Sequence, residues 1–348
     1  MTTTTPPTCR NDPLYSRARQ SVLFRRDAGI ANLQRALRIG FQHAIHLRDA
    51  MLGDILECHD GHWRIREGID MRHDPLLHDK LTQAAQWIRS ATSMVVAAGA
   101  GMGVDSGLPD CCDDNGFWRA YPALGRSRMH FEDIASPRAF EKHPATAWGF
   151  YGHRLNLYRA TTPHAGFGLL RSWSQRMPQG CFVFTSNVDG QFQKAGFPSA
   201  RVYECHGSIH RLQCTGHCNE ILWPTADLHP QVDETTCQWQ GELPCCPHCG
   251  ALLRPNILMF DDWQWSHTRS LKQRMLLERW LDSAQSPLVI EIGAGQTFAT
   301  VREFSRRMQQ RGSQLIRINP YDVRVHNPYA IEIALGAKEA LKAIASHL

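Results

Sequence analysis

Residues 94–107 read MVVAAGAGMGVDSG, a run of five apolar residues that passes directly into a glycine-rich segment. A continuous apolar run of this length is typical of a strand that is covered on both faces of a parallel sheet. Glycines directly after a strand let backbone N–H groups approach a phosphate, because no Cβ atom is in the way. The segment departs from a strict G-x-G-x-x-G pattern, so two interpretations remain: a nucleotide-binding loop and a glycine-rich structural turn.

Three further apolar runs repeat this arrangement. They are Cys181–Thr185 (CFVFT), Leu288–Ile292 (LVIEI) and Leu315–Ile318 (LIRI), and helix-like stretches separate them. The residues that follow these runs are SNVDG, GAG and NP. An open α/β sheet binds its ligand at the carboxyl ends of its strands. The sequence therefore predicts a parallel α/β sheet with a ligand site at that edge.

The composition is that of an ordinary globular protein. Of 348 residues, 43% are apolar and 20% are charged, which excludes collagen-like, coiled-coil and disordered chains. The net charge of +5 comes from scattered basic residues, so we expect no direct contact with nucleic acid. No stretch approaches the roughly 18–20 apolar residues of a bilayer span, and the N-terminus lacks the apolar core of a secretory signal.

From these features we expect no membrane association and a cytoplasmic location. The alternative is an organelle transit peptide, because arginines and serines are mixed between residues 10 and 26. Asp12 and Asp27 argue against that alternative.

Apolar periodicity divides the chain. Between residues 28 and 58 apolar residues recur at helical spacing: Ile30, Leu33, Leu37, Phe41, Leu52, Ile55 and Leu56. We therefore expect residues 1–77 to be a helical N-terminal extension. An amphipathic face of Leu81, Ala84, Ala85 and Ile88 opens the main domain, residues 78–348, and a helix ends it near Ile344.

Four of the twelve cysteines fall in two close pairs, Cys214-x3-Cys218 and Cys246-x2-Cys249. Four thiolates can close a tetrahedral shell around one zinc ion, which leaves no open position and indicates a structural site. In a chain that is not exported, such clusters favour metal over disulfides. Buried free cysteines are the alternative, and the nearby Cys245, His217 and His248 leave the ligand set open.

Five motifs and the zinc pattern resemble the sirtuins, the NAD-dependent protein deacylases. The motifs are GAGMGVDSGLPD (99–110), TSNVDGQFQKAG (185–196), ECHGSIHRLQC (204–214), CPHCGALLRPNILMF (246–260) and IGAG (292–295) with RINP (317–320). They occur in the family's order, and the resemblance covers about residues 78–348. It implies a Rossmann-like parallel sheet domain with a smaller lobe, formed by a zinc ribbon at about 207–255 and a helical insertion at about 113–165. NAD and an acyl-lysine protein or peptide would meet in the cleft between them.

The resemblance also implies roles for individual residues. His206, one of eighteen histidines, falls on the family's general base, and a pKa near neutrality suits it to take a proton from a ribose hydroxyl. Asn187 and Asp189 fall on the nicotinamide pocket and complete the catalytic set. The structural zinc would be held by Cys214, Cys218, Cys246 and Cys249. The implied cofactor contacts are Gly99, Ala100, Gly101, Pro109, Asp110, Ser186, Asn187, Asp189, Gly293, Ala294, Gly295 and Asn319.

The implied reaction consumes NAD, releases nicotinamide and moves the acyl group from lysine to ADP-ribose. One departure bears directly on it. After Asp110 the family reads Phe-Arg-Gly, whereas this chain reads Cys111-Cys112-Asp113. The phenylalanine that shields the reaction centre and the arginine that orients the ribose and phosphates are both missing. Asp113 adds a negative charge near a pyrophosphate.

A second departure is Phe260-Asp261-Asp262 in place of Phe-Gly-Glu, and Asp261 is expected to disturb pairing with a substrate peptide. Three hypotheses follow from the departures. The chain is a slow or unusual deacylase, an enzyme that cleaves NAD or transfers ADP-ribose without an acyl-lysine, or a catalytically silent NAD-binding module. A further hypothesis gives Cys111 or Cys112 a role as nucleophile, redox switch or metal ligand; the alternative is a loop with inert thiols.

Overall fold

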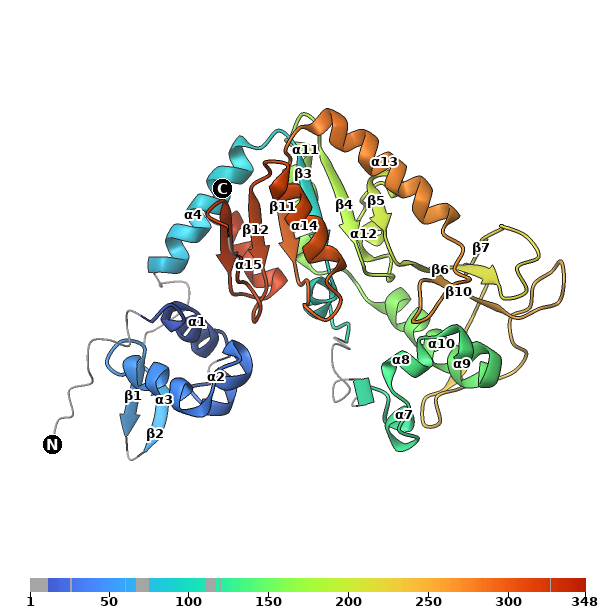
Figure 1. The fold of residues 1–348 in the computed structure, drawn as a ribbon, viewed down its shortest axis with the longest axis horizontal. Coiled ribbons are helices and arrows are strands. Elements are labelled where there is room, and N and C mark those ends of the chain that lie inside the picture. The colour runs from blue at the N-terminus through green and yellow to red at the C-terminus, as the bar shows by residue number, and fades with distance from the viewer. Residues whose placement is uncertain are drawn as a thin grey trace. The chain divides into compact units, whose positions relative to one another are not determined.

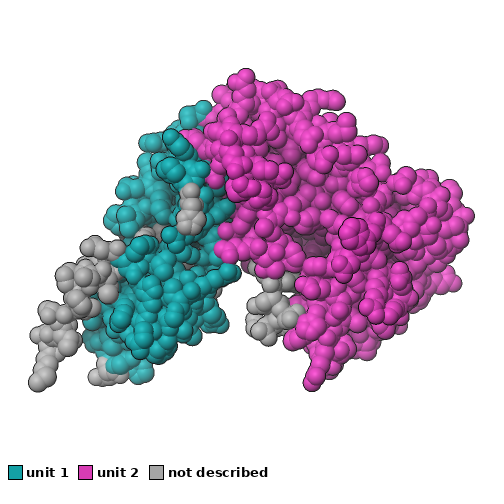
Figure 2. All heavy atoms as spheres, in the orientation of Figure 1, with its two compact units in different colours: residues 1–90, 315–348 teal, residues 91–314 magenta. Residues whose placement is uncertain are grey.

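The computed structural model describes residues 12–25, 27–59, 61–66, 75–109, 117–118, 120–325 and 327–348. They belong to two compact units, shown in Figure 2: unit 1 comprises residues 1–90 and 315–348, and unit 2 comprises residues 91–314. A parallel sheet is formed by six strands in the order β13 (Ala330–Ile333), β12 (Leu315–Ile318), β11 (Leu288–Ile292), β3 (Met94–Ala98), β4 (Cys181–Thr185) and β5 (Val202–Glu204). Figure 1 labels all of these strands except β13. The predicted α/β class with a parallel sheet is confirmed.

The four predicted strands have the expected bounds: β3 Met94–Ala98, β4 Cys181–Thr185, β11 Leu288–Ile292 and β12 Leu315–Ile318. Every residue of β3 and β11 is buried, which explains the unbroken apolar runs. Ala98 is the register partner of both Thr185 and Ile292. The three segments that follow these strands therefore start at one level of the sheet edge.

Two edge strands were not predicted, β5 (Val202–Glu204) and β13 (Ala330–Ile333). Half-buried and buried positions alternate in β13, and β5 has only three residues, so neither carries an unbroken apolar run. The helices with described bounds in unit 2 are α5 (Gly101–Val104), α7 (Pro122–Arg126), α8 (Phe131–Ile134), α9 (Pro137–Lys142), α10 (Pro144–Ala160), α11 (Ala165–Gln175), α12 (Gln191–Lys194), the 3₁₀ turn η3 (Ser199–Arg201), α13 (Thr268–Ala284) and α14 (Thr300–Gln310).

Unit 1 departs in one segment from the expected helical N-terminal extension. Helices α1 (Tyr15–Arg25), α2 (Ile30–Leu37) and α3 (Phe41–Ala50) are followed by an antiparallel hairpin of β1 (Leu56–His59) and β2 (His62–Ile65). Leu56, expected on a helix, thus begins a strand. The helical pattern breaks at Gly53, whose φ of 78° lies in the left-handed region that favours glycine. Unit 1 also contains α4 (Pro75–Ser90), β12, β13 and α15 (Ala337–Ala345), and the two helices lie where periodicity predicted them.

The smaller lobe of unit 2 combines strands and helices around one core. Strand β6 (Gly207–Cys214) pairs antiparallel with β10 (Leu253–Ile257) and β7 (Trp223–Pro224), and β8 (Val232–Asp233) pairs with β9 (Gln238–Trp239). Helix α10 packs closely on the segment of β9, and Gly149 permits this approach. A Cβ atom at that position would lie 2.2 Å from the Cys237 carbonyl oxygen. The predicted boundaries of the zinc module, the helical insertion and the extension stay predictions.

None of the helices in the described part of the chain combines the length and the apolar character needed to cross a bilayer.

Candidate functional site

Two glycine loops meet at the carboxyl edge of the sheet. The Gly99 N–H donates to the Ile292 carbonyl at 3.0 Å, and the Gly101 N–H donates to the Gly293 carbonyl at 3.1 Å. A Cβ atom on Gly101 would lie 2.6 Å from the Gly293 Cα, and one on Gly293 would lie 2.4 Å from Gly101 backbone atoms. These two glycines are therefore required for the loops to pack against each other, a use that the sequence pattern alone does not reveal.

The residues after β4 are oriented by the same edge. The buried Thr185 hydroxyl donates to the Ala98 carbonyl at 2.9 Å and accepts the Asn187 N–H at 3.0 Å. The Asn187 side-chain amide donates to the Gly99 carbonyl at 3.0 Å. Asn187 thereby links the first glycine loop to β4, and its position is fixed by two strands.

Asp189 carries a buried carboxyl group, with 8% of the residue's surface exposed. Burial raises its pKa to about 6, and the nearby Glu204 carboxylate acts in the same direction. The Gln191 N–H donates to Oδ1 at 2.9 Å and partly offsets this effect. The carboxyl group of Asp189 therefore titrates close to neutral pH.

His206 follows β5 and is fixed by its backbone, because its carbonyl oxygen accepts the Leu258 N–H at 2.9 Å. Its Nε2 lies 3.4 Å from the Thr300 hydroxyl oxygen at the start of α14. Burial lowers the pKa of His206 below the ordinary histidine value. The ring is therefore neutral at pH 7 and able to accept a proton.

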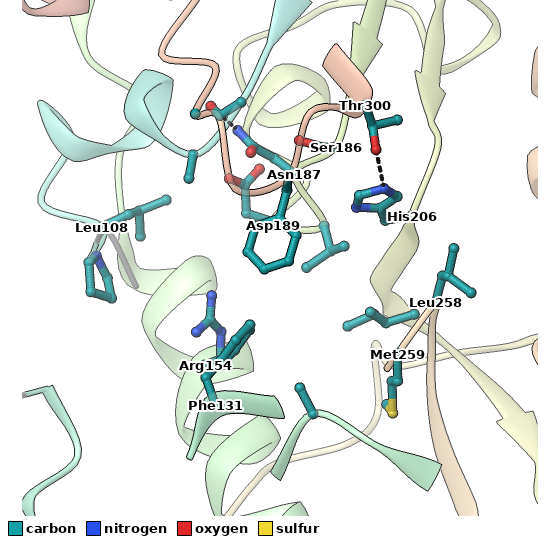
Figure 3. A pocket seen from close by; sticks show the side chains of 18 of the residues that line it. Leu108, Phe131, Arg154, Ser186, Asn187, Asp189, His206, Leu258, Met259 and Thr300 are labelled. Atoms are coloured by element: carbon teal, nitrogen blue, oxygen red, sulfur yellow. Dashed lines mark hydrogen bonds between the residues drawn. The ribbon is translucent and has the colours of Figure 1, made fainter. Parts of the chain in front are cut away.

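These residues border one pocket of about 360 Å³ in unit 2 (Figure 3). The predicted residues among its lining are Gly99, Ala100, Pro109, Ser186, Asn187, Asp189, His206, Ala294 and Gly295. A volume of this size falls within the range of small-molecule sites. The structure thus brings together the ends of three strands and the histidine after a fourth.

The remaining predicted residues lie elsewhere. Gly101 and Gly293 pack behind the lining, against each other. Asn319 follows β12 in unit 1, where its side-chain oxygen accepts the N–H groups of Tyr321 and Asp322. Asp110, together with the unusual segment Cys111-Cys112-Asp113, lies outside the described residues. The cofactor roles assigned to these residues stay predictions.

Sequence reasoning missed one wall of the pocket. It consists of Phe131 from α8, and Phe150, Tyr151, Arg154 and Tyr158 from α10. Figure 3 shows the Arg154 guanidinium directed into the pocket, and its Nε donates to the Tyr158 hydroxyl at 2.8 Å. The available signal was the four-residue spacing of Phe150, Arg154 and Tyr158, which places a cation on the aromatic face of one helix.

The segment after β10 explains the second sequence departure. Asp261 has a φ of 52°, a left-handed conformation that favours glycine and that aspartate also tolerates. The side chain of Asp262 is fully buried and pairs with buried Arg254 at 2.8 Å, and it also accepts the Met259 N–H at 3.3 Å. The turn is therefore held by a buried ion pair, although the effect of Asp261 on a bound peptide stays a prediction.

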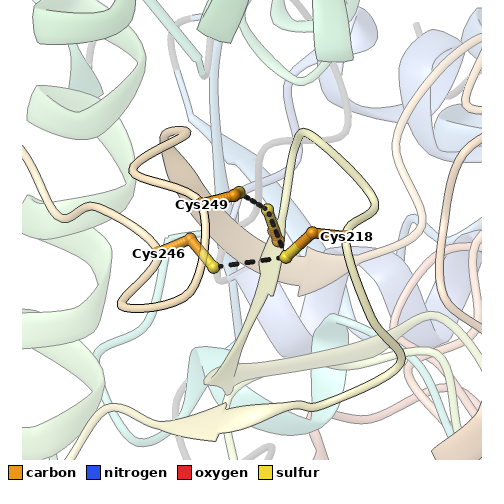
Figure 4. Close-up of side chains that lie close together, drawn as sticks. Cys218, Cys246 and Cys249 are labelled. Atoms are coloured by element: carbon orange, nitrogen blue, oxygen red, sulfur yellow. Dashed lines mark hydrogen bonds between the residues drawn. The ribbon is translucent and has the colours of Figure 1, made fainter.

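The four predicted zinc ligands lie together (Figure 4). Cys214 Sγ lies 3.5 Å from Cys249 Sγ and 3.8 Å from Cys218 Sγ, and Cys218 Sγ lies 3.5 Å from Cys246 Sγ. Two sulfurs that each lie about 2.3 Å from a tetrahedral zinc ion are about 3.8 Å apart. The cluster fits one structural zinc ion. Among the described residues, the metal-binding group comprises these four cysteines, without Cys245, His217 or His248.

Comparison with known proteins agrees with this geometry. The model of the Sir2 family matches residues 99–284, more than half of the chain. An NAD-dependent protein deacylase of Aquifex aeolicus is 26% identical over 256 residues, which cover 74% of this chain and 95% of that protein. NAD-dependent protein deacetylase 1 of Geobacillus kaustophilus is 29% identical, with 67% of this chain and 84% of that protein covered.

A crystal structure of a Sir2 homolog–NAD complex matches with a TM-score of 0.60 and 25% identity. The match covers 76% of this chain and 93% of that one. A parallel α/β sheet, a four-cysteine cluster and the family model therefore agree. This chain belongs to the Sir2 family.

Proposed function

We propose that this protein is an NAD-dependent protein-lysine deacylase whose reaction takes place in the pocket lined by Asn187, Asp189 and His206. The observation that carries the proposal is that residues from separate motifs converge on this one pocket. The names of the relatives, NAD-dependent protein deacylase and deacetylase, support the same activity.

The residues present suit NAD. The first glycine loop presents Gly99 and Ala100 to the pocket, and the second presents Ala294 and Gly295. Bulky side chains at these positions would reduce the space for a pyrophosphate. Asn187 and Asp189 offer an amide and a carboxyl group, which can recognise the carboxamide of nicotinamide. Bound NAD would supply the ribose carbon that leaves nicotinamide and the ribose hydroxyls.

His206 is the proposed general base. It is neutral at pH 7 because burial lowers its pKa, so a ring nitrogen can take a proton from a ribose hydroxyl. Thr300 contacts Nε2 and helps set the ring's orientation. Phe131, Leu258 and Met259 give the pocket apolar walls that exclude water and accept the aliphatic part of an acyl-lysine.

Nicotinamide release tests the proposal. Zinc-loaded protein is incubated with NAD, with and without acyl-lysine peptides, and with His206→Ala and the exposed His229→Ala as matched variants. We expect release that depends on peptide, persists in His229→Ala and falls at least about 100-fold in His206→Ala. Full activity in His206→Ala would overturn the assignment of the base.

The sequence favours a second candidate. Cys111-Cys112-Asp113 replaces the Phe-Arg-Gly expected of a deacylase, so NAD glycohydrolase or ADP-ribosyltransferase activity is the alternative. Release of nicotinamide without peptide would support it. NAD binding without any release would instead support a catalytically silent module.

We also propose how the chain is divided into domains and where the protein lies in the cell. Residues 1–77 form an extension, residues 78–348 the sirtuin-like part, with a zinc module at about 207–255 and a helical insertion at about 113–165. The proposed location is the cytoplasm. Fractionation of cells that express the full chain tests it, since recovery with an organelle would contradict it.

A further inference from the structure

A second cavity, of about 480 Å³, lies next to the NAD pocket within unit 2. It is walled by the end of α10, the turn before α12, strand β6 and the start of α13. Its charged and titratable lining residues are Arg159, Lys194, His210, Arg211, Arg269, Asp189 and Glu204. The two cavities share Tyr158 and Asp189 as lining residues. Neither the family motifs nor the proposed reaction gives this cavity a use.

The cavity has an excess of positive charge. Glu204 is buried and forms an ion pair with Arg269. Within the part of the chain that the structure describes, Arg159, Lys194 and Arg211 form no ion pair with a carboxylate. The lining has four cations, Arg159, Lys194, Arg211 and Arg269, against two carboxylates, Asp189 and Glu204, so a net positive charge remains that a bound anion would offset.

Two of these cations are held in place by neutral groups. Arg159 donates to the carbonyl oxygens of Leu228, at 2.6 Å, and Thr225. Lys194 donates to the carbonyl oxygens of Arg159 and Thr161, at 2.5 and 2.6 Å. Each side chain keeps further N–H donors, because a guanidinium has five and an ammonium has three. The cations are thus positioned without being neutralised.

Further donors at the cavity have no acceptor within the described part of the chain. Arg211 is half-buried, and its guanidinium makes no hydrogen bond to another described residue. The Nη1 atom of Arg269 is buried and has no hydrogen-bond partner among the described residues. A buried donor without an acceptor destabilises the fold, and a bound oxyanion would relieve that cost.

We propose that this second cavity is a ligand site, distinct from the NAD pocket, that binds a small polyanion through Arg159, Lys194, Arg211 and Arg269. The ligand carries at least two oxyanion groups, phosphate or carboxylate, because the positive charges stand on separate elements around the cavity. Its volume suits a metabolite-sized molecule. The site does not depend on the proposed reaction, and it can be tested by binding alone.

Isothermal titration calorimetry on the full-length, zinc-loaded protein tests this proposal. The probes are inorganic pyrophosphate and citrate, each titrated with and without saturating ADP-ribose to separate the NAD pocket from the second cavity. We expect at least one probe to bind when ADP-ribose is present. Binding of pyrophosphate alone would assign phosphate, and binding of citrate alone would assign carboxylate.

The double variant Lys194→Ala/Arg211→Ala is expected to weaken this binding at least 10-fold. The matched control, Lys272→Ala/Arg279→Ala, removes two exposed cations from α13 and should leave the affinity unchanged. Circular dichroism and zinc content show whether each variant is folded, and Arg211→Gln alone replaces the double variant if that one unfolds. Absence of binding by both probes at millimolar concentration, or equal affinity in the cavity variant, would overturn the proposal.

Discussion

Asp189 places a carboxyl group at the pocket, in a position where burial disfavours its charged form. Its carboxyl group borders the pocket, and burial raises its pKa to about 6. The folded state therefore disfavours the charged form more than the unfolded chain does, where an aspartate has a pKa near 3.9. At pH 8 this difference destabilises the protein, and the effect disappears as the pH falls through 6 towards 4.

We therefore predict that Asp189→Asn raises the free energy of unfolding at pH 8 by roughly 1–3 kcal/mol. The asparagine oxygen can still accept the Gln191 N–H, so the turn is kept. The measurement is urea unfolding at pH 8 and pH 4. The gain should vanish at pH 4, and a gain of equal size at both pH values would show that charge burial is not its cause.

Thr300 is the second residue whose role follows from one contact. Its hydroxyl oxygen lies 3.4 Å from His206 Nε2, so we assign it as a positioning residue for the proposed base. Thr300→Val keeps the shape and removes the hydroxyl. We predict a fall in kcat/KM of about 3–10-fold, the effect of one net hydrogen bond.

Thr300→Ser separates positioning from packing. It restores the hydroxyl without the methyl group, so we expect it to recover most of the activity. Steady-state kinetics on both variants, with thermal unfolding as the check on folding, make the comparison. Equal losses in the serine and valine variants would contradict the role of the hydroxyl.

At the scale of elements, the contact between the two glycine loops determines the shape of the sheet edge. Gly293 has a φ of 61° and touches Gly101 backbone atoms, whereas a Cβ atom on Gly295 would meet nothing within 4 Å. We predict that Gly293→Ala lowers the free energy of unfolding by roughly 2–4 kcal/mol, from backbone strain and overpacking together.

Gly295→Ala is the matched control, because it adds the same methyl group in open space two residues away. Its stability should stay within about 0.5 kcal/mol of the parent. Denaturant unfolding of the two variants decides the matter. If both lost the same stability, the close approach of the loops would not be the reason for the glycine.

The zinc cluster is the second element-scale feature with a direct consequence. Cys214 and Cys246 are part of the same buried cluster as Trp148 and Phe150 of α10. Loss of the metal should therefore loosen the helices of the lobe as well as its strands. We predict that Cys246→Ser abolishes zinc binding and costs on the order of 3–5 kcal/mol of stability.

Cys245→Ser tests whether the effect belongs to the cluster. Cys245 adjoins Cys246 in sequence but is exposed and lies outside the four-cysteine group. One zinc ion per chain should remain in this variant, as measured by metal analysis and thermal unfolding. Zinc retained in Cys246→Ser and lost in Cys245→Ser would require a different ligand set.

At the scale of the whole molecule, the long buried strands could be predicted and the short edge strands could not. A strand covered on both faces reads as an unbroken apolar run, as β3 and β11 do. Strand β5 has three residues and β13 alternates, so their pairing comes from the neighbouring strand. The hairpin of β1 and β2 was missed for a similar reason, since it is short and half-exposed.

The sequence predicted those parts of the site whose residues are close together in the chain. The two cysteine pairs indicated the metal cluster, and the motif around His206 indicated the histidine of the pocket. The contact of Gly101 with Gly293 and the entry of Arg154 into the pocket depend on tertiary packing between distant segments. Neither contact produces a pattern within a single stretch of sequence. The cavity lined by Arg159 and Arg211 could not be predicted for the same reason.

The fate of the acyl group tests the proposed deacylation most directly. Zinc-loaded protein is incubated with NAD and an acetyl-lysine peptide, and mass spectrometry follows the peptide, nicotinamide and the ADP-ribose products together. We predict one O-acetyl-ADP-ribose and one free lysine for each nicotinamide released. Nicotinamide and unmodified ADP-ribose beside an intact peptide would contradict deacylation and assign the pocket to NAD cleavage.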